Sequence, residues 1–398
     1  MTVASHPDFP DWTIYGIAHN WGNACELETS FQTALTSSSD SVREERRILL
    51  GHPTRTLTLN WRGITRERLN KILVSMRNMS SGYWVVPIYP DQSELTVDYS
   101  SGTSLYCSTL LRRFFVGSRI LVLGEDSHEW AEVAAVHDDR LVLTEELEEI
   151  HQVGLTLVLP CIDVEPLLSP EINMVTGRVG NLSLTAQEIV GPNTLPGFDG
   201  VPTGFSTFLG LPILYLEHNW IDTLTLGYVQ EGSLDPLGRG RVYHLRGDHP
   251  RVTMDLSLLL ERADAMSLVH FFEGRKGRAL PFWMADPEDL WEILEKDANG
   301  INIEPIGDFS DFEDLLEYIG IRDEDGDVYV RKVLSLTNYT TYWRISTTTT
   351  LPDVTISSVA RARISRFDSD AMTEEWVTSE VMRTKIKVIE LLDCAEEL

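Results

Sequence analysis

Alternation of apolar and polar residues is the first pattern that the chain shows. In two distant segments the apolar side chains recur at every second position: Leu57, Leu59 and Trp61 in one, and Val252, Met254, Leu256 and Leu258 in the other. A period of two places such side chains on one face of a β-strand. Each segment is therefore predicted to form a strand with one buried face.

A helical period follows each of these strands. Apolar residues recur at positions i, i+3, i+4 and i+7: Leu69, Ile72, Leu73 and Met76 in the first case, and Ala265, Leu268, Val269 and Phe272 in the second. This spacing forms one apolar stripe along an α-helix. We predict one short helix after each strand, with a further strand behind it.

The rest of the chain is strand-rich. Short apolar runs separated by turn residues fill "SRILVLGEDSHEWAEVAAVHDDRLVLTEEL" and "DVYVRKVLSLTNYTTYWRISTTTT", and alternating segments follow at 177–189 and 384–392. Such runs are typical of antiparallel sheets. The sequence predicts a mainly β protein with minor α content.

The chain also repeats itself at an offset of about 200 residues. His19-Asn20-Trp21 matches His218-Asn219-Trp220, and "HPTRTLTLNW" matches "HPRVTMDLSL". "RERLNKILVSMRNMSSGYWVVPIYPD" then matches "ERADAMSLVHFFEGRKGRALPFWMAD", with Pro87 aligned to Pro281, and the order is kept. We interpret the chain as a tandem duplication of a β-sandwich or barrel-like domain, each copy carrying one short helix and a small barrel-like β insertion.

A segment rich in proline and glycine separates the two copies. "VGPNTLPGFDGVPTGFSTFLGLP" has no periodicity, and both residue types interrupt helices and strands. The predicted organisation is a first β domain at 1–190, a linker at 191–212 and a second β domain at 213–398.

Charge and composition restrict the function. Of the 398 residues, 61 are Asp or Glu and 33 are Lys or Arg, giving a net charge of −28. A surface of this sign repels nucleic acid and anionic membranes. There is neither an apolar run long enough to cross a bilayer nor a signal-peptide pattern at the start, so we expect synthesis in the cytoplasm without membrane insertion.

Candidate sites of chemistry are weak. Asp323, Asp325 and Asp327 alternate as in a calcium loop, but Val328 and Leu334 stand where that loop needs Gly and Glu, so a hairpin turn is favoured. We also predict that "GEDSHEW" lies between strands, that His19 and His218 are structural, and that the four cysteines are free and mostly buried: Cys25, Cys107, Cys161 and Cys394. No catalytic residue, metal site or cofactor is predicted, and we expect a protein that is not an enzyme.

A basic turn follows the second predicted helix in "HFFEGRKGRALPFWMADPEDL". Gly274, Arg275, Lys276, Gly277 and Arg278 follow a helix rather than preceding one, which disfavours an anion site. Cations complement a helix C-terminus, and glycine commonly caps it in the left-handed conformation. Because the first copy lacks these basic residues, we interpret the turn as a helix stop in which the charges matter least.

This stretch resembles tail proteins of long-tailed bacteriophages and gene transfer agents. The resemblance rests on a strand headed by Arg, a helix ending in "FFEGRKGR", and the aromatic and acidic segment "PFWMADPED"; it is strongest over 241–292 and weaker over 43–92. The upstream "SDSVREERRILLGHPTRTLTLNW" is similar to the family's Glu-Arg segment. The motif residues are Gly274, Arg275, Gly277, Arg278, Pro281, Phe282, Trp283 and Asp286, with Trp84, Pro87 and Asp91 in the first copy.

The resemblance implies a distal-tail or baseplate-hub protein of the virion, which forms a ring below the tail tube and attaches tip or fibre proteins. Its partners would be further copies of itself, the tail tube protein and other baseplate or fibre proteins, with DNA only passing through the lumen. Two similar domains in each chain favour a trimer with pseudo-sixfold symmetry, and a hexamer is the alternative.

Two other functions stay open from the sequence. A receptor-binding tail-tip protein would recognise carbohydrate, with Trp130 and Trp343 as candidates for exposed sugar-stacking rings. A glycan-cleaving enzyme would use two of the many carboxylates, although no pattern isolates a pair.

Overall fold

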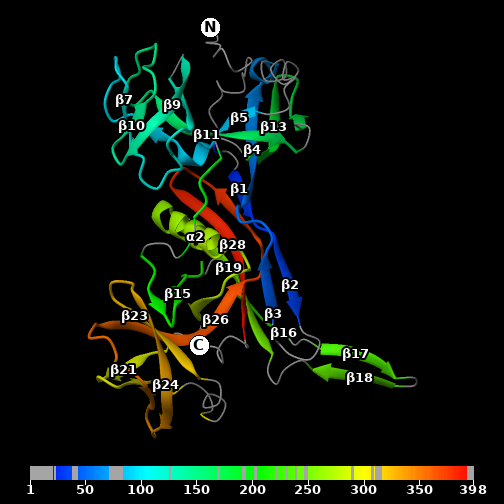
Figure 1. Cartoon of the computed structure of the whole chain (residues 1–398), viewed down its shortest axis with the longest axis vertical. Coiled ribbons are helices and arrows are strands. Elements are labelled where there is room, and N and C mark those ends of the chain that lie inside the picture. Colours follow the sequence, from blue (N-terminus) through cyan, green and yellow to red (C-terminus); the bar gives the residue numbers. More distant parts are fainter. Residues whose placement is uncertain are drawn as a thin grey trace.

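The protein is mainly β, as its sequence predicts (Figure 1). The computed structural model describes residues 21, 24–37, 44–70, 84–124, 127–167, 171–190, 194–198, 200, 204–219, 222–229, 232–237, 240–245, 250–287, 291–305, 309 and 316–391. The molecule is elongated, with most of the first half of the chain at one end, the strands β21–β25 of the second half at the other, and α2 between them (Figure 1).

Over its described residues, the first half contains thirteen strands, one 3-10 helix and a helical stretch at residues 66–70. The elements are β1 (Cys25–Ser30), β2 (Thr33–Ser37), β3 (Glu44–Ile48), β4 (Thr54–Thr65), β5 (Trp84–Pro87), η1 (Tyr89–Asp91), β6 (Ser93–Glu94), β7 (Ser104–Tyr106), β8 (Arg119–Leu123), β9 (His128–His137), β10 (Arg140–Leu143), β11 (Leu157–Pro166), β12 (Glu171–Met174) and β13 (Val179–Glu188). The remainder of the helix predicted after β4 lies outside the described residues.

In its described residues, the second half has the α-helix α2 and a set of strands similar to that of the first half. The elements are β14 (Thr207–Phe208), β15 (Leu211–Leu214), β16 (Thr225–Val229), β17 (Gly232–Leu237), β18 (Gly240–Leu245), β19 (Arg251–Glu261), α2 (Arg262–Gly274), β20 (Phe282–Ala285), β21 (Ile293–Lys296), β22 (Gly300–Ile303), β23 (Tyr318–Asp323), β24 (Val328–Asn338), β25 (Trp343–Thr347), β26 (Ile356–Phe367), β27 (Ala371–Trp376) and β28 (Val381–Glu390).

The two halves pair their strands in the same order. In the first half β4 lies between β1 and β13, β13 also pairs with β11 and β12, and β11 pairs with β5. In the second half β19 lies between β16 and β28, β28 also pairs with β26 and β27, and β26 pairs with β20. This shared order supports the tandem-duplication hypothesis.

The inserted strands also correspond. The series β11–β8–β9–β10–β7 of the first half has the same antiparallel pairings as the series β26–β23–β24–β25–β22 of the second. Each insertion has its own apolar core, separate from that of the main sheet of its half. The expected β insertion is therefore present in both halves.

One tight turn occurs in both halves with the same hydrogen bonds. The Oγ1 atom of Thr176 accepts hydrogen bonds from the amides of Arg178 and Val179, and Thr378 does the same for Glu380 and Val381, at 3.1 to 3.2 Å in each case. The turn joins β12 to β13 and β27 to β28. It gives a fixed point for comparing the two halves.

The predicted periodicities are confirmed by burial. Leu57, Leu59 and Trp61 of β4 are each 1% exposed, and the alternating apolar side chains of β19 are also buried. The apolar face of α2 packs on the inner faces of β19 and β28. The alignment of Pro87 with Pro281 was wrong, because Pro87 ends β5 whereas Pro281 precedes β20.

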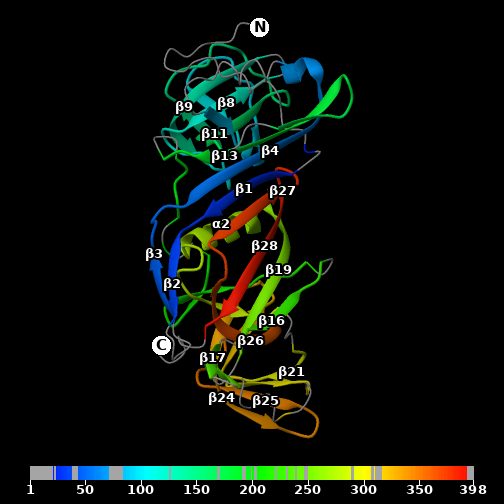
Figure 2. The same ribbon diagram turned by 90° about the vertical axis from the view of Figure 1, so that its right-hand side faces the viewer.

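The halves meet through strand pairing as well as packing. Strand β1 of the first half pairs antiparallel with β27 of the second, from Cys25 opposite Trp376 to Ser30 opposite Ala371. The hairpin of β2 and β3 extends from β1 along the second half (Figure 2). The main sheets of the two halves are thus joined edge to edge.

Candidate functional site

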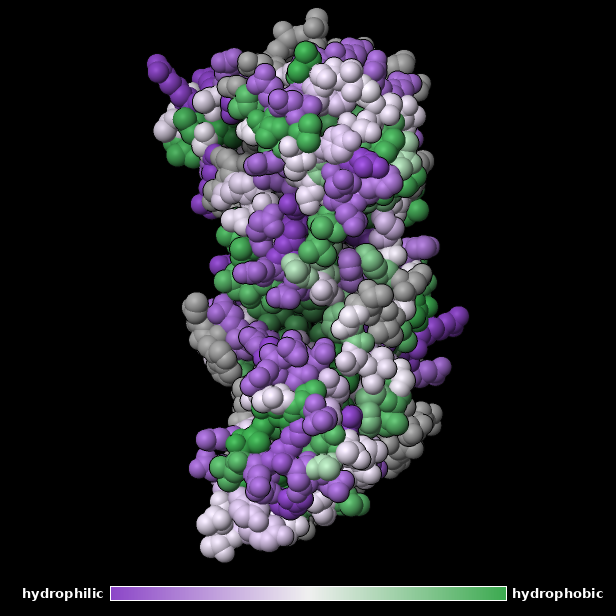
Figure 3. Space-filling view, turned by 90° about the vertical axis from the view of Figure 1, so that its left-hand side faces the viewer, coloured by the Kyte–Doolittle hydropathy of each residue, from purple (hydrophilic) through white to green (hydrophobic). Residues whose placement is uncertain are grey.

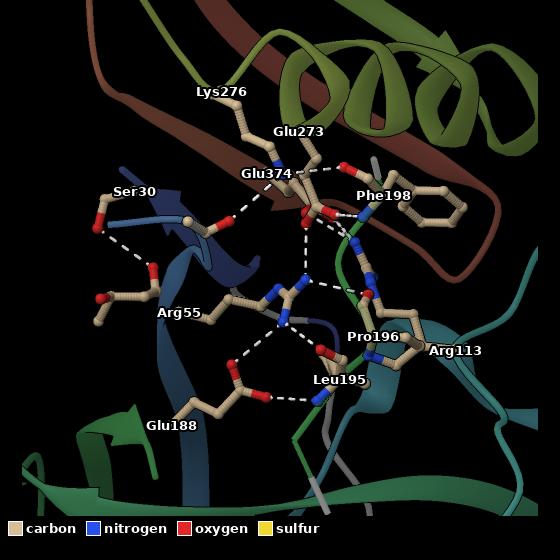
Figure 4. Close-up of polar contacts among 12 residues, drawn as sticks. Ser30, Arg55, Arg113, Glu188, Leu195, Pro196, Phe198, Glu273, Lys276 and Glu374 are labelled. Carbon is tan, nitrogen blue, oxygen red and sulfur yellow. Dashed lines mark hydrogen bonds and ion pairs between the residues drawn. The ribbon is translucent and has the colours of Figure 1, made fainter. Parts of the chain in front are cut away.

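The most elaborate polar arrangement in the described structure lies at the junction between the halves. Arg55 of β4 is buried there, with Glu188 of β13 and Glu273 of α2 on either side (Figure 4). The guanidinium donates to Glu188 at 3.2 Å and to Glu273 at 2.8 Å, and also to the carbonyls of Leu195 and Pro196. Burial raises the pKa of Glu188, and Arg55 opposes that shift.

The linker is held by the same cluster. The amide of Leu195 donates to Glu188, and the amide of Phe198 donates to Glu273. The Phe198 ring also contacts the ring of His270 on α2, with a centroid separation of 3.4 Å. Residues of the predicted linker are therefore a fixed part of the junction in the stretch that is described.

A second buried cluster lies beside the β1–β27 pairing. Asp91, 0% exposed, accepts hydrogen bonds from Arg113 at 3.1 Å and from Arg262 at 2.9 Å. Arg113 also contacts both oxygens of Glu374 on β27, which is itself 0% exposed. Burial lowers the pKa of Arg113, but the two carboxylates outweigh it and raise that pKa overall. The guanidinium stays charged, so these groups form a tightly paired ionic network.

A third cluster fixes the β2–β3 hairpin. Glu44 of β3 accepts hydrogen bonds from Arg251 of β19 and Arg366 of β26, the latter at 3.0 Å. Burial opposes ionisation of Glu44, but the hydrogen bonds and charges of the two arginines outweigh it and lower its pKa. All three clusters pair charges of the first half with charges of the second, so their combined effect is to fix one relative position of the halves.

The basic turn is a helix stop, as predicted, and Gly277 is its left-handed glycine. The helix ends at Gly274, and Lys276 and Gly277 have φ values of 55° and 61°. A side chain at Gly277 would approach the backbone of Asp370 to 3.1 Å. The turn thus needs glycine at 277 for both its conformation and its packing.

The expectation that the charges of this turn matter least was wrong. Arg275 is 6% exposed and faces the carbonyls of Gly200 and Pro281, and Arg278 forms an ion pair with Asp370 at 3.2 Å. Lys276 faces the carbonyl of Gly51 and the ring of Phe31, across the junction. The three cations connect α2 to the turn between β26 and β27, to the linker and to the first half.

The other motif residues belong to the core. Phe282 and Trp283 of β20 are 0% exposed, and the indole N–H of Trp283 donates to the carbonyl of Phe208. Asp286 is buried beside Arg363 at 2.8 Å. In the first half Trp84 and Pro87 are buried in β5, and Asp91 belongs to the ionic network described above.

The remaining candidates for chemistry have structural surroundings. His218 is buried, its Nε2 contacts the carbonyl of Asp222 and its Nδ1 faces the amide of Ser257. Residues 323–327 form the turn of the β23–β24 hairpin, as predicted, and His128 begins β9 after the β8–β9 turn. Cys25, Cys107 and Cys161 are free and buried; Cys394 and His19 lie outside the described residues.

The two tryptophans proposed for sugar stacking are differently placed. Trp343 is 3% exposed and packs edge-on against Phe309 in the second insertion, so its prediction as an exposed ring was wrong. Trp130 of β9 is partly buried against the first core. Trp343 therefore presents no open aromatic face of the kind that sugar stacking requires.

The surface carries no single dominant hydrophobic area on the face seen in Figure 3, where hydrophilic and hydrophobic residues alternate along the whole length. A hollow of about 580 Å³ lies beside α2 and β15, with charged lining residues Glu217, Glu261, Asp264, Arg322 and Asp327. Over the described ranges, no three His, Cys, Asp or Glu residues are grouped so that they could hold a metal ion. Nor is any helix in those ranges both long and apolar enough to span a membrane.

Sequence reasoning missed the residues that build the junction. Arg55, Glu188, Glu273 and Glu374 are scattered along the chain, and no local spacing connects them. One available signal was charge inside an alternating strand: Arg55 stands at an inward position of β4, where the pattern calls for an apolar residue. A second signal was the similarity of the turn sequences "MVTGRV" and "WVTSEV", which aligns the two halves at this point.

Comparisons with known proteins give no family. No protein-family model matches the chain, and no match was found among curated proteins.

Proposed function

We propose that this protein is a structural component of a bacteriophage tail tip, a distal-tail or baseplate-hub protein that forms a ring continuing the tail tube and attaching tip or fibre proteins. The preferred assembly is a trimer in which six similar halves surround the lumen, with a hexamer of whole chains as the alternative. The resemblance of the 241–292 segment to phage tail proteins suggests the location in the virion. The fold supports the ring, because it contains two similar halves.

The observation that carries the proposal is the repeated order of strand pairing in two halves joined edge to edge. A ring that follows a sixfold tube needs six similar building units, and two similar halves per chain supply six from three chains. The junction contributes rigidity, because three buried ionic clusters tie the halves together. A tube segment needs such rigidity, whereas an enzyme of two unlike domains has no need of matched halves.

The net charge of −28 suits a channel wall. DNA passing a surface of like charge is repelled and does not bind to it, so it slides freely. The carbohydrate-binding alternative loses one of its two candidate rings, because Trp343 is buried.

Labelling of intact particles tests the proposed location. Antibodies against this protein should bind at the distal end of the tail in electron micrographs of particles from cells that carry the gene, and mass spectrometry of the purified particles should detect the chain. A label confined to the capsid, or the absence of the chain from purified particles, would contradict the proposal. Turnover of host-surface glycans by the purified chain would contradict its non-enzymatic part.

A further inference from the structure

Two edges of the joined sheets have one strand neighbour each in the described structure. Strand β12 pairs with β13, and β16 pairs with β19. Their counterparts in the other half are β27 and β1, and these two pair with each other at the junction. The edges β12 and β16 are the counterparts of these two strands, but in the described structure they do not pair with each other.

The correspondence can be fixed residue by residue. Leu27 of β1 lies opposite Leu57, and Leu226 of β16 lies opposite Met254. Leu57 and Met254 are both the sixth residue of the repeated segments beginning at His52 and His249, so Leu226 corresponds to Leu27.

The other edge is fixed by the reproduced turn. Met174 and Trp376 each directly precede the Val-Thr pair of that turn, so Met174 corresponds to Trp376 and Ile172 to Glu374. At the junction Leu27 lies opposite Glu374. Transferring this register to the outer edges places Leu226 opposite Ile172, Thr225 opposite Asn173, and Leu224 opposite Met174.

The inward positions of both outer edges are apolar and are more exposed than their counterparts. Tyr228 is 70% exposed and Met174 50%, whereas the corresponding Thr29 and Trp376 are both 0% exposed. Exposed apolar side chains on a sheet edge mark a place where another strand can add. Pairing of the two edges would cover both.

The β17–β18 hairpin also differs from its counterpart in what it contacts. The β2–β3 hairpin follows β1 and lies along the second half, where Glu44 is held by Arg251 and Arg366. The corresponding β17–β18 hairpin follows β16 and projects away from the body of the molecule (Figure 1). The same placement on a neighbouring chain would lay it along that chain's first half.

The geometry points to head-to-tail association of this chain, in which β16 of one copy pairs antiparallel with β12 of the next in the register of β1 and β27. The contact is heterologous: each copy offers one edge and receives the other, and such contacts close into a ring when the rotation allows. This contact would build the ring of the proposed function. It is inferred from the corresponding strands of the two halves and does not depend on a location in the virion.

Disulfide trapping in the full chain tests the register. The variant Thr225→Cys/Asn173→Cys, in a Cys394→Ser background, should form disulfides between chains on mild oxidation, because antiparallel partners lie within disulfide reach. Glu26→Cys/Glu375→Cys is the matched control: these residues are partners within one chain, so its disulfide should leave the chain monomeric on denaturing gels. Tyr228→Cys/Asn173→Cys is out of register and should not cross-link.

The cross-linking results distinguish the strand pairing from the trimer. No interchain product from the first variant, or equal product from the out-of-register variant, overturns the strand pairing. A product that ends at three chains supports the trimer of the proposed function, and a ladder beyond three contradicts that trimer while leaving the pairing intact. Labelling of particles reports the virion location independently.

A charge variant provides a second readout without cysteines. In Tyr228→Lys/Met174→Lys the added ammonium groups should abolish self-association in light scattering, because they place like charges along both edges. Thermal unfolding of the isolated chain should be unchanged, since both side chains are at least half exposed. Association that survives these substitutions would contradict the proposed contact.

Discussion

The junction between the halves and the two outer edges are built from corresponding strands, yet their chemistry differs. At the junction, β1 and β27 are buried beside ionic clusters that include Glu374 and Arg113. At the outer edges, the position of Glu374 is taken by Ile172, which is apolar, and that of Trp376 by Met174, which is half exposed. One strand topology can therefore form a permanent contact in one place and an open edge in another.

Charge explains the contrast. Paired charges that are buried require each other, because removal of one partner leaves the other without solvent or counter-charge. They specify a single arrangement and suit a contact made once, during folding. An edge lined with apolar side chains can stay in water as a monomer and become buried later, which suits a contact made during assembly.

The largest expected effect comes from breaking the ionic network. Asp91→Ala should lower the free energy of unfolding by about 3–5 kcal/mol, because Arg113 and Arg262 would both lose a buried counter-charge. Glu317→Ala is a matched control in an exposed ion pair with Lys332 and should cost about 0–1 kcal/mol. Urea unfolding measures both; a loss for Asp91→Ala no greater than that of the control would contradict a network that fixes the junction.

Corresponding leucines give the next comparison. Leu27→Ala should cost about 2–5 kcal/mol, since Leu27 is 0% exposed in the junction. The same change at Leu226, which is only partly buried on the outer edge, should cost roughly 1 kcal/mol in the dilute chain. Equal losses in chemical denaturation would show that the outer edge is already covered in the isolated protein.

His270 links the junction to pH. Burial lowers the pKa of this imidazole to about 4, below its usual 6.5. The folded protein keeps it neutral while the unfolded chain takes up a proton, so stability is lost as the pH falls from about 6.5 towards 4. His270→Phe should flatten this part of the stability profile, removing roughly one proton of uptake on unfolding. An unchanged slope between pH 7 and pH 4.5 in the variant would assign the acid sensitivity to other groups.

The smallest effect concerns a repulsive pair within the junction. Burial and then the facing Glu375 raise the pKa of Glu26, because two carboxylates stand directly opposite each other in the β1–β27 register. A carboxyl whose pKa is raised in the fold favours folding at low pH and opposes it as the pH rises through that pKa. Glu26→Gln should therefore stabilise the protein by about 0.2–1 kcal/mol at pH 7. The gain should disappear at acidic pH in thermal melts; a loss of stability at pH 7 would show that Glu26 has a favourable partner.

Local sequence predicted the local structure well. Alternation identified β4 and β19, the helical period identified α2, and glycine at 277 identified the helix stop. These features depend on neighbours within a few residues, where the period of the backbone decides which side chains share a face. The internal repeat was also visible, because an order of matched segments does not depend on the fold.

The candidate site could not be predicted in the same way. Glu374 meets Arg113 only because β27 crosses to the first half, and Glu273 meets Arg55 only because α2 ends at the junction. The basic turn was misjudged for the same reason, since the partners of Arg275 and Arg278 lie in other segments of the chain.

The amino-acid sequence alone was enough to predict strands such as β4 and β19, the end of α2 and a pattern shared by two halves, because each of these follows from short-range periodicity or from repetition. Which strand edges meet depends on the tertiary fold. Strand pairing joins segments separated by hundreds of positions, and the burial that makes a charge costly or an edge adhesive exists only once those segments are together.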